Sequence, residues 1–372
     1  MKIGIPKEIK NHEYRVGMTP TAVREAIHHG HEVVVESNAG VGINATDDDY
    51  AAVGAQVLNS AAEVFADADM IVKVKEPQAD ERKMLRPGQI LFTYLHLAPD
   101  PAQTKDLVES GAICIAYETV TDAHGGLPLL APMSQVAGRM SIQAGAHCLE
   151  REAGGRGVLL AGVPGVRPAK VVIIGGGVVG ENAAYMAVGM GADVTILDRN
   201  VDTMRALVVR FGQSIKTVYS TQLALEEEVL AADLVIGAVL LPGAEAPKLV
   251  TRDLVSRMKP GSVIVDVAID QGGCAETSKA TTHADPTYVV DEVVHYCVAN
   301  MPGAVSHTST YALNNVTLPF TLAIADKGYK QALLDDPHLL NGLNVCEGKV
   351  TYKAVAEDLG YDYVDPRAAL GA

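Results

Sequence analysis

VVIIGGGVVGENAAYMAVGMGADVTILD, from Val171 to Asp198, is the stretch that decides the fold of the second half of this chain. Its β-branched apolar start is typical of a buried strand, and glycines in the GxGxxG spacing follow at Gly175, Gly177 and Gly180. The first glycine allows a tight turn, the second lets backbone approach a pyrophosphate, and the third lets helix and strand pack closely. The next helix then points free N–H groups at the anion. The stretch therefore predicts a dinucleotide-binding βα unit.

The choice of cofactor depends on the strand that follows this helix. The strand pattern ADVTIL ends in Asp198. A carboxylate there can accept hydrogen bonds from the adenosine ribose of NAD, and its charge repels the 2′-phosphate of NADP. We therefore expect NAD. Arg199, the next residue, could pair with a 2′-phosphate, which leaves NADP as the alternative.

Length and charge bound the class of protein. The 372 residues suggest two domains, at roughly 150 residues per domain, and the 48% hydrophobic content supplies a core for both. The net charge is −15, from 30 basic and 45 acidic residues, and there is no basic run. This balance argues against a nucleic acid or an anionic membrane as partner and favours small metabolites.

The remaining composition excludes several further classes. Five widely spaced cysteines without a CxxC pair favour reduced thiols over disulfides or a zinc knuckle. Neither the N-terminal MKIGIPKEIK nor any other segment has the apolar length of a signal peptide or a membrane span, about 18 residues for the latter. No His, Asp or Glu cluster has metal-ligand spacing, so no metal is expected. These features predict a cytoplasmic protein.

Strand and helix patterns alternate along most of the chain, which predicts parallel βα units. Thr19 and Pro20 are typical of a helix N-terminus, and Gly30 of a helix end. A helical pattern over residues 133–153 and a glycine-rich segment lead into the dinucleotide unit, and the last segment is mostly helical. The fold expected is two doubly wound parallel sheets, in which a Rossmann NAD-binding domain (130–305) is inserted into a flavodoxin-like catalytic domain (1–129 and 306–372).

The catalytic domain should bind its ligand beyond the carboxyl ends of its strands. Lys75 ends MIVKVK, His96 ends ILFTYLH and Glu118 ends AICIAYE, each one βα unit after the last, and Arg15 lies in the loop after the first strand. Arginine and lysine can hold a substrate carboxylate and polarise a keto oxygen. Histidine suits proton transfer near neutral pH. Each could instead be a solvated loop residue or a structural histidine.

One more candidate lies in the NAD-binding domain. Asp270 ends SVIVDVAID, again past the carboxyl end of a strand pattern, where it could take part in proton transfer. It could also be a turn residue before the two glycines that follow. Asp266 lies inside the strand pattern and is expected to be structural.

The chain resembles the NAD-dependent alanine dehydrogenases, and also the related NAD(H)-binding component of proton-translocating transhydrogenases, over nearly its whole length. The resemblance implies that Arg15 and Lys75 hold the substrate carboxylate and carbonyl, while His96 and Asp270 perform acid/base steps. Gly17 stands where the family commonly has alanine, which leaves Arg15 in place. Besides the glycine-rich stretch, the resemblance is carried by GIPKEIKNHEYRVGMTP, LAPMSQVAGRMSIQAGA, DVAIDQGGCAETSKATTHADPTY and NMPGAVSHTSTYALNNVTLP.

The resemblance also implies further NAD contacts and a homohexameric assembly. Thr203 stands where some relatives carry a basic cofactor-binding side chain, so it is excluded. The implied contacts, in addition to Gly175, Gly177 and Gly180, are Ser134, Val178, Val179, Asp198, Ser220, Val239, Leu240, Val267, Ala268, Ile269, Asp270, Lys279, Val298, Ala299, Asn300 and Met301.

The implied reaction is the reversible oxidative deamination of L-alanine to pyruvate, ammonia and NADH. Hydride would leave Cα for nicotinamide C4, water would attack the iminium, and the two domains would close over the reactants. Two alternatives stay open. A transhydrogenase component would bind NAD(H) and need a membrane partner, but Lys75, His96 and Asp270 together speak against it. A regulatory Rossmann sensor would need neither a protonatable histidine nor two substrate cations.

Overall fold

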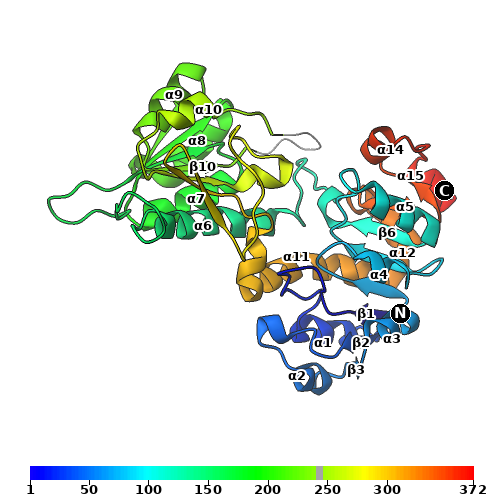
Figure 1. Ribbon diagram of the computed structural model, residues 1–372. Coiled ribbons are helices and arrows are strands. Elements are labelled where there is room, and N and C mark those ends of the chain that lie inside the picture. Colours follow the sequence, from blue (N-terminus) through cyan, green and yellow to red (C-terminus); the bar gives the residue numbers. More distant parts are fainter. Residues whose placement is uncertain (240–245) are drawn as a thin grey trace. The chain divides into compact units, whose positions relative to one another are not determined.

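The computed structural model describes residues 1–239 and 246–372, and these divide into two compact units. Unit 1 comprises Met1–Met133 and Gly303–Ala372, and unit 2 comprises Ser134–Pro302. The chain passes from unit 1 to unit 2 within α6 (Ala131–Cys148) and returns within the 3-10 helix η5 (Met301–Val305) (Figure 1). The domain bounds expected from the sequence, 130 and 305, stay a prediction.

Unit 1 contains an eight-stranded sheet in the order β15-β14-β6-β5-β4-β1-β2-β3. The pairs β14–β6 and β14–β15 are antiparallel and the other pairs are parallel. The run β2-β1-β4-β5-β6 has the flavodoxin-like 2-1-3-4-5 order, to which β3 adds an edge strand. The strands are β1 (Lys2–Ile5), β2 (Glu32–Glu36), β3 (Gln56–Leu58), β4 (Met70–Val72), β5 (Ile90–Thr93), β6 (Ile113–Ala116), β14 (Leu343–Cys346) and β15 (Lys349–Val350).

The helices of unit 1 follow the strands as βα units require. The helix α1 begins as predicted, with the Thr19 side chain accepting a hydrogen bond from Ala22 N, Pro20 in the first turn, and Gly30 at φ +87° after the end. The others are η1 (Val41–Ile43), α2 (Asp47–Ala52), α3 (Ala61–Asp67), α4 (Ala79–Arg82), α5 (Pro101–Ser110), η2 (Tyr117–Thr119), α11 (Ser306–Lys327), α12 (Tyr329–Asp335), α13 (Pro337–Leu340), α14 (Lys353–Leu359) and α15 (Pro366–Leu370), with α1 at Pro20–His28.

Unit 2 contains a seven-stranded sheet in the order β12-β13-β11-β10-β7-β8-β9, in which only β12–β13 is antiparallel. The run β9-β8-β7-β10-β11-β13 has the 3-2-1-4-5-6 order of a Rossmann fold. Its elements are β7 (Lys170–Ile174), α7 (Val178–Gly189), β8 (Asp193–Asp198), α8 (Val201–Phe211), η3 (Gly212–Ser214), β9 (Ile215–Tyr219), α9 (Gln222–Ala231), β10 (Leu234–Gly237), α10 (Arg252–Ser256), β11 (Val263–Asp266), η4 (Val267–Gln271), β12 (Thr287–Val290) and β13 (Val293–Tyr296).

The prediction of two doubly wound sheets is confirmed, but the sheets are mixed rather than purely parallel. The antiparallel edges are hairpins with tight two-residue turns, at Asp291–Glu292 and at Glu347–Gly348. Asp291, Glu292 and Glu347 all have positive φ, and such turns usually contain asparagine or glycine. The β12–β13 hairpin was not predicted because its turn residues are acidic. The β14–β15 hairpin was not predicted because it lies in the last segment, which was expected to be mostly helical.

The cysteines are buried as free thiols, as the sequence predicts. Burial raises the pKa of the Cys148 thiol to about 11, so it is a neutral core residue at physiological pH. In the described parts of the chain, no helix combines the length and hydropathy that a membrane crossing requires.

Candidate active site

The loops that follow β4, β5 and β6 bring three of the predicted rim residues to one edge of unit 1. These strands are parallel neighbours, so their carboxyl ends lie side by side. The strands are shorter than the sequence patterns suggested. Lys75 and His96 lie in the loops beyond β4 and β5, and Glu118 lies in the 3-10 helix η2. These three residues therefore lie beyond the strand ends, where their backbone groups need hydrogen-bond partners other than a neighbouring strand.

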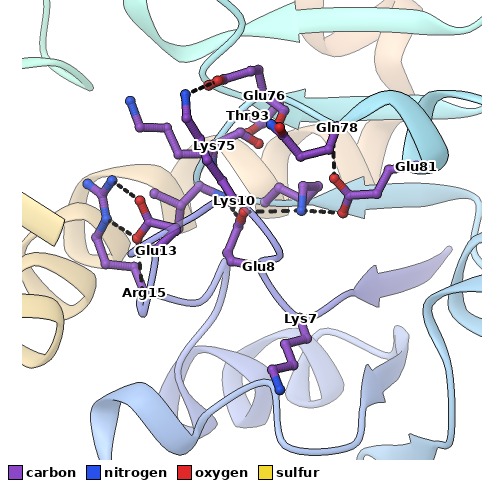
Figure 2. A network of polar contacts seen from close by, with 12 residues as sticks. Lys7, Glu8, Lys10, Glu13, Arg15, Lys75, Glu76, Gln78, Glu81 and Thr93 are labelled. Carbon is purple, nitrogen blue, oxygen red and sulfur yellow. Dashed lines mark hydrogen bonds and ion pairs between the residues drawn. The ribbon is translucent and has the colours of Figure 1, made fainter. Parts of the chain in front are cut away.

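Those partners are visible for Lys75 (Figure 2). Its backbone N–H donates to Glu8 Oε1 at 3.3 Å, and Val74 N donates to the same oxygen at 2.7 Å. Its carbonyl accepts a hydrogen bond from Thr93 Oγ1 at 3.0 Å. The main chain of Lys75 is thus held from both sides, and its side chain extends to the side of the network where Arg15 lies (Figure 2).

Lys73, Glu8 and Glu81 form a buried triad of charged side chains next to this loop. Lys73 Nζ donates to Glu8 Oε2 at 3.2 Å and to Glu81 Oε1 at 2.7 Å, and all three side chains are almost fully buried. Burial opposes the Lys73 charge, but the two carboxylates raise the pKa of Lys73 above its usual value. Burial also raises the pKa of Glu8, against the opposing charge of Lys73. The triad therefore keeps a charged lysine inside the sheet edge and fixes Glu8 where it can hold the loop.

Arg15 is buried and forms a two-point ion pair with Glu13. Its Nε donates to Glu13 Oε1 at 2.7 Å and its Nη2 to Oε2 at 2.6 Å. The third guanidinium nitrogen, Nη1, lies 3.0 Å from Met133 Sδ. Although burial disfavours its charge, the hydrogen bonds and charge of Glu13 raise the pKa of Arg15. The carboxylate therefore fixes the plane of the guanidinium.

His96 is half exposed and lies against a buried aromatic ring. The Tyr94 ring stacks on the imidazole with centroids 5.9 Å apart and planes 9° apart. Tyr94 is itself fixed, because its hydroxyl donates to Leu129 O at 2.6 Å and its ring packs edge-on against Tyr117. His96 has φ +50°, in the left-handed region that a residue with a Cβ rarely adopts.

In unit 2 the glycine turn has the geometry that a pyrophosphate cradle needs. Gly175 has φ +102°, and a Cβ on Gly180 would lie 1.8 Å from Gly175 O, so only glycine fits both positions. A Cβ on Gly177, the N-cap of α7, would have no atom within 4 Å among the described residues. The N-terminus of α7 is therefore open where an anion would approach, and these residues fit a dinucleotide.

Asp198 ends β8 as predicted, and its carboxylate also braces the glycine turn. Oδ2 accepts a hydrogen bond from Gly176 N at 2.6 Å, and Oδ1 accepts one from Asn200 N at 2.7 Å. Ser220 lies beside it, since Ser220 N donates to Asp198 O at 2.9 Å. Arg199 is exposed. Sequence reasoning missed this bracing role, because it considered Asp198 only as a partner of the ribose.

The strand expected to end at Asp270 ends instead at Asp266. Asp270 is exposed in η4, whereas Asp266 is completely buried. The Asp266 Oδ2 atom accepts hydrogen bonds from Cys274 N at 2.8 Å and from Ser278 Oγ at 2.5 Å. Asp266 therefore closes the segment after η4 onto the sheet, which agrees with a structural role.

The remaining cofactor candidates lie in segments after the strands of unit 2. A bridge between Thr281 and Val298 places the Lys279 segment beside residues 298–301. Lys279 is exposed, with its Nζ 4.6 Å from the centre of the Tyr288 ring. The side chains of Val179, Ala268, Ile269, Val298 and Met301 are buried, Val178 is exposed, and Ser134, Val239, Val267, Ala299 and Asn300 are intermediate; Leu240 lies outside the described residues.

Sequence reasoning missed the carboxylates that hold Arg15 and the main chain of Lys75. Glu8 and Glu13 stand in the quoted stretch GIPKEIKNHEYRVGMTP but received no role. A signal for the triad was present, since Lys73 interrupts the apolar run MIVKVK and a buried lysine needs a carboxylate partner. Over residues 1–239 and 246–372, no group of three His, Cys, Asp or Glu side chains is arranged to hold a metal ion.

Comparison with known families and proteins places this geometry in context. The model of the alanine dehydrogenase/PNT N-terminal domain matches residues 4–137, and that of the C-terminal domain matches residues 141–353. The chain is 62% identical over 371 residues to the alanine dehydrogenase of Halomonas elongata, and 56% identical over 371 residues to that of Methanococcus maripaludis; each alignment covers 100% of both chains. It is also 56% identical over 371 residues to the alanine dehydrogenase of Bacillus subtilis, covering 100% of this chain and 98% of the other.

Two solved structures agree with these matches. An L-alanine dehydrogenase structure superposes with a TM-score of 0.94 at 52% identity, over 97% of this chain and 99% of the other. A transhydrogenase from Sinorhizobium meliloti superposes with a TM-score of 0.81 at 25% identity, over 95% of this chain and 100% of the other.

Proposed function

The chain belongs to the alanine dehydrogenase/PNT family and is an NAD-dependent alanine dehydrogenase; we propose that Arg15, Lys75, His96 and Asp270 carry its reaction, the reversible oxidative deamination of L-alanine to pyruvate, ammonium and NADH. The observation that carries the activity is the set of relatives named alanine dehydrogenase, which match at 54% to 62% identity over the whole chain. The likeness to the transhydrogenase, at 25% identity, reflects the shared family.

Lys75 and Arg15 are proposed to bind the substrate carboxylate and carbonyl oxygen. The Arg15–Glu13 pair has no net charge, so it offers oriented donors more than attraction. Lys75 is proposed to supply the ammonium group that attracts the substrate carboxylate. Its main chain is held by Glu8 and Thr93, which favours a defined position for the ammonium group. One residue orients the substrate and the other attracts it.

His96 and Asp270 are proposed to move the protons. His96 is accessible and its ring is fixed on Tyr94, so it can exchange a proton with the substrate oxygen or nitrogen without losing its orientation. Asp270 is exposed in η4 of unit 2, where its carboxylate is accessible. NAD, when bound, supplies the two-electron acceptor that this redox chemistry requires.

The cofactor is proposed to lie with its pyrophosphate at the glycine turn and its adenosine ribose at Asp198. The open space at Gly177 and the free N-terminus of α7 support the first placement. The second is supported by the position of Asp198 at the end of β8. The other proposed contacts are those implied by the resemblance, of which Val298 and Met301 have buried side chains and would act through their backbone.

Assembly into a homohexamer in the cytoplasm is part of the same proposal. Residues 157–169 extend away from the sheet of unit 2 (Figure 1), and Leu159, Val163 and Val166 each expose more than half of their surface. Apolar side chains on a projecting segment favour burial against another copy of the chain. Light scattering at several concentrations measures the mass, and a monomer at every concentration would rule the assembly out.

The activity is tested by adding pyruvate and ammonium to the chain with NADH. Oxidation of NADH at 340 nm that needs both compounds is the expected result, because the amine must replace the keto oxygen. A chain that binds NADH but does not oxidise it would instead behave as the binding component of a transhydrogenase.

A further inference from the structure

Glu118 is the rim residue that has no role in the proposed reaction. Its carboxylate accepts hydrogen bonds from the backbone of the His96 segment. His96 N donates to Glu118 Oε1 at 2.6 Å. Leu95 N donates to Oε1 and to Oε2, each at 3.2 Å. Two successive backbone N–H groups therefore converge on one carboxylate, the arrangement that proteins use as an anion-binding nest.

The nest depends on the left-handed backbone of His96. A non-glycine residue with φ near +50° is strained and persists only when its surroundings hold it. The flanking Leu95 carbonyl is held as well, because Gln103 Nε2 donates to Leu95 O at 2.6 Å. Glu118 lies in η2, which begins directly after the neighbouring strand β6. Its carboxylate thus compensates a conformation that the His96 segment would not keep by itself.

The same carboxylate also faces the imidazole. Glu118 Oε1 lies 4.0 Å from His96 Nδ1, while the side chain of Glu118 is largely buried. The Tyr94 ring stacks on the imidazole and limits its rotation.

We propose that Glu118 is the positioning residue of His96: it fixes the left-handed backbone of His96 through the Leu95 and His96 amides and so holds the imidazole against the Tyr94 ring. The proposal rests on the role of His96 in the proposed function. Glu118 makes no proton transfer itself, so its removal should lower the rate without preventing cofactor binding, which is assigned to unit 2.

The test compares Glu118→Gln and Glu118→Ala with the control Glu109→Gln in the full chain. Glu109 is an exposed glutamate on α5 of the same unit, and it pairs with Lys105 on the same helix. Alanine removes the acceptor, so amide hydrogen exchange at Leu95 and His96 should become about 10- to 100-fold faster, the range for losing hydrogen bonds to a charged group. Glutamine keeps an acceptor oxygen, so exchange should change less.

Kinetics then separate positioning from a purely structural effect. Glu118→Ala should lower kcat with pyruvate by at least about tenfold, with the dissociation constant of NADH unchanged. Glu118→Gln keeps an acceptor for the two amides, so its kcat should lie between that of Glu118→Ala and the native value. Unchanged exchange in Glu118→Ala would overturn the backbone role. A native kcat in Glu118→Ala would overturn the positioning of His96.

A parallel His96→Ala variant distinguishes failure of this inference from failure of the proposed function. If His96→Ala turns over normally, the catalytic role of His96 is lost and the proposed function fails at that residue. The exchange rates of Leu95 and His96 in the Glu118 variants still decide whether Glu118 holds the segment. If His96→Ala is inactive while both Glu118 variants are fully active, the positioning role alone is wrong.

Discussion

In both units the strand order reverses at the first strand, but the loop after that strand carries charged side chains in unit 1 and glycines in unit 2. In each sheet the first strand lies where the strand order reverses, and the loop after that strand opens a helix. In unit 2 this loop is the glycine turn, where backbone N–H groups face an open space at Gly177. In unit 1 it contains Glu8, Lys10, Glu13 and Arg15, whose charges pair among themselves and with the β4 loop (Figure 2).

This difference indicates that the reversal of strand order sets where a ligand can bind in each sheet. The side chains of the loop after the first strand then determine which ligand chemistry the site suits. Open parallel sheets bind ligands at the switch point of the strand order. Backbone donors without side chains suit a diffuse pyrophosphate, whereas a small carboxylic acid needs donors placed to within a few tenths of an ångström. In the proposed site, the buried carboxylates of unit 1 would provide that placement, because Glu13 holds Arg15 directly and Glu8 holds the main chain of Lys75.

The largest effect is expected from removing His96, the residue of unit 1 that is proposed to transfer protons. His96→Ala should lower kcat by a factor on the order of 10² to 10⁴, because a positioned acid/base group is lost. The dissociation constant of NADH, measured by fluorescence titration, should stay within about twofold of the native value. A variant with near-native kcat would remove His96 from the reaction and break the division of labour between the units.

The glycine turn can be tested with two glycines of the same helix. Gly177→Ala has room for its methyl group but would place it where the pyrophosphate approaches, so the fold should persist while NADH affinity falls about 10- to 100-fold. Gly189→Ala, also without neighbours within 4 Å, is the control and should bind NADH normally. Equal affinities in the two variants would show that the cofactor does not approach the turn.

Lys75 and Arg15, the two cationic side chains proposed to bind the substrate, should differ in how much their removal destabilises the fold. Lys75→Ala should raise KM for pyruvate by about 10- to 100-fold, since a charge-assisted contact is lost, with little change in the melting temperature. Arg15→Ala should raise KM and also destabilise unit 1 by about 3–5 kcal/mol, because the buried Glu13 carboxylate loses its two-point ion pair with the guanidinium. Calorimetry beside kinetics checks both, and a similar melting temperature for the two variants would contradict the buried pair.

The parts predicted correctly share one physical basis. Glycines, strand ends and helix caps are local patterns, so the Rossmann turn, the α1 cap and the order of βα units could be read from neighbouring residues. The role of Glu8 could not be predicted in this way, because Glu8 meets Lys73 and Lys75 only after β1 pairs with β4. Glu118 was expected at the rim, but its contact with the His96 backbone likewise forms only after β5 pairs with β6.

Cofactor preference refines the assignment of Asp198. Asp198→Ala should lower kcat/KM for NAD about tenfold or more, because both the ribose contact and the bond to Gly176 N are lost. Its removal should raise the relative kcat/KM for NADP, since the charge that repels the 2′-phosphate is gone. The measurement needs both cofactors at one ionic strength. A native enzyme that uses NADP as well as NAD would contradict the role given to Asp198.

The smallest expected effect is a pH dependence of stability that arises from a buried histidine in unit 2. His96 of unit 1 is half exposed, whereas His295 of unit 2 is completely buried between Thr277 Oγ1, 2.7 Å from its Nε2, and Val293 O, 2.9 Å from its Nδ1. Burial is the main cause that lowers the pKa of His295 below 6.5. The folded chain therefore binds fewer protons at this site than the unfolded chain does.

The sign of the pH dependence follows from that depressed pKa. Above about pH 6.5 His295 is neutral in both states and costs nothing, whereas below it the unfolded chain gains a proton that the fold resists. The stability of unit 2 should therefore fall from pH 6.5 downward until the pKa of folded His295 is reached. Hydrogen exchange of β12 and β13, corrected for intrinsic rates, should accelerate between pH 6.5 and 5 in the native chain and less so in His295→Gln. Identical pH slopes in the two chains would mean that another group controls the acid stability of unit 2.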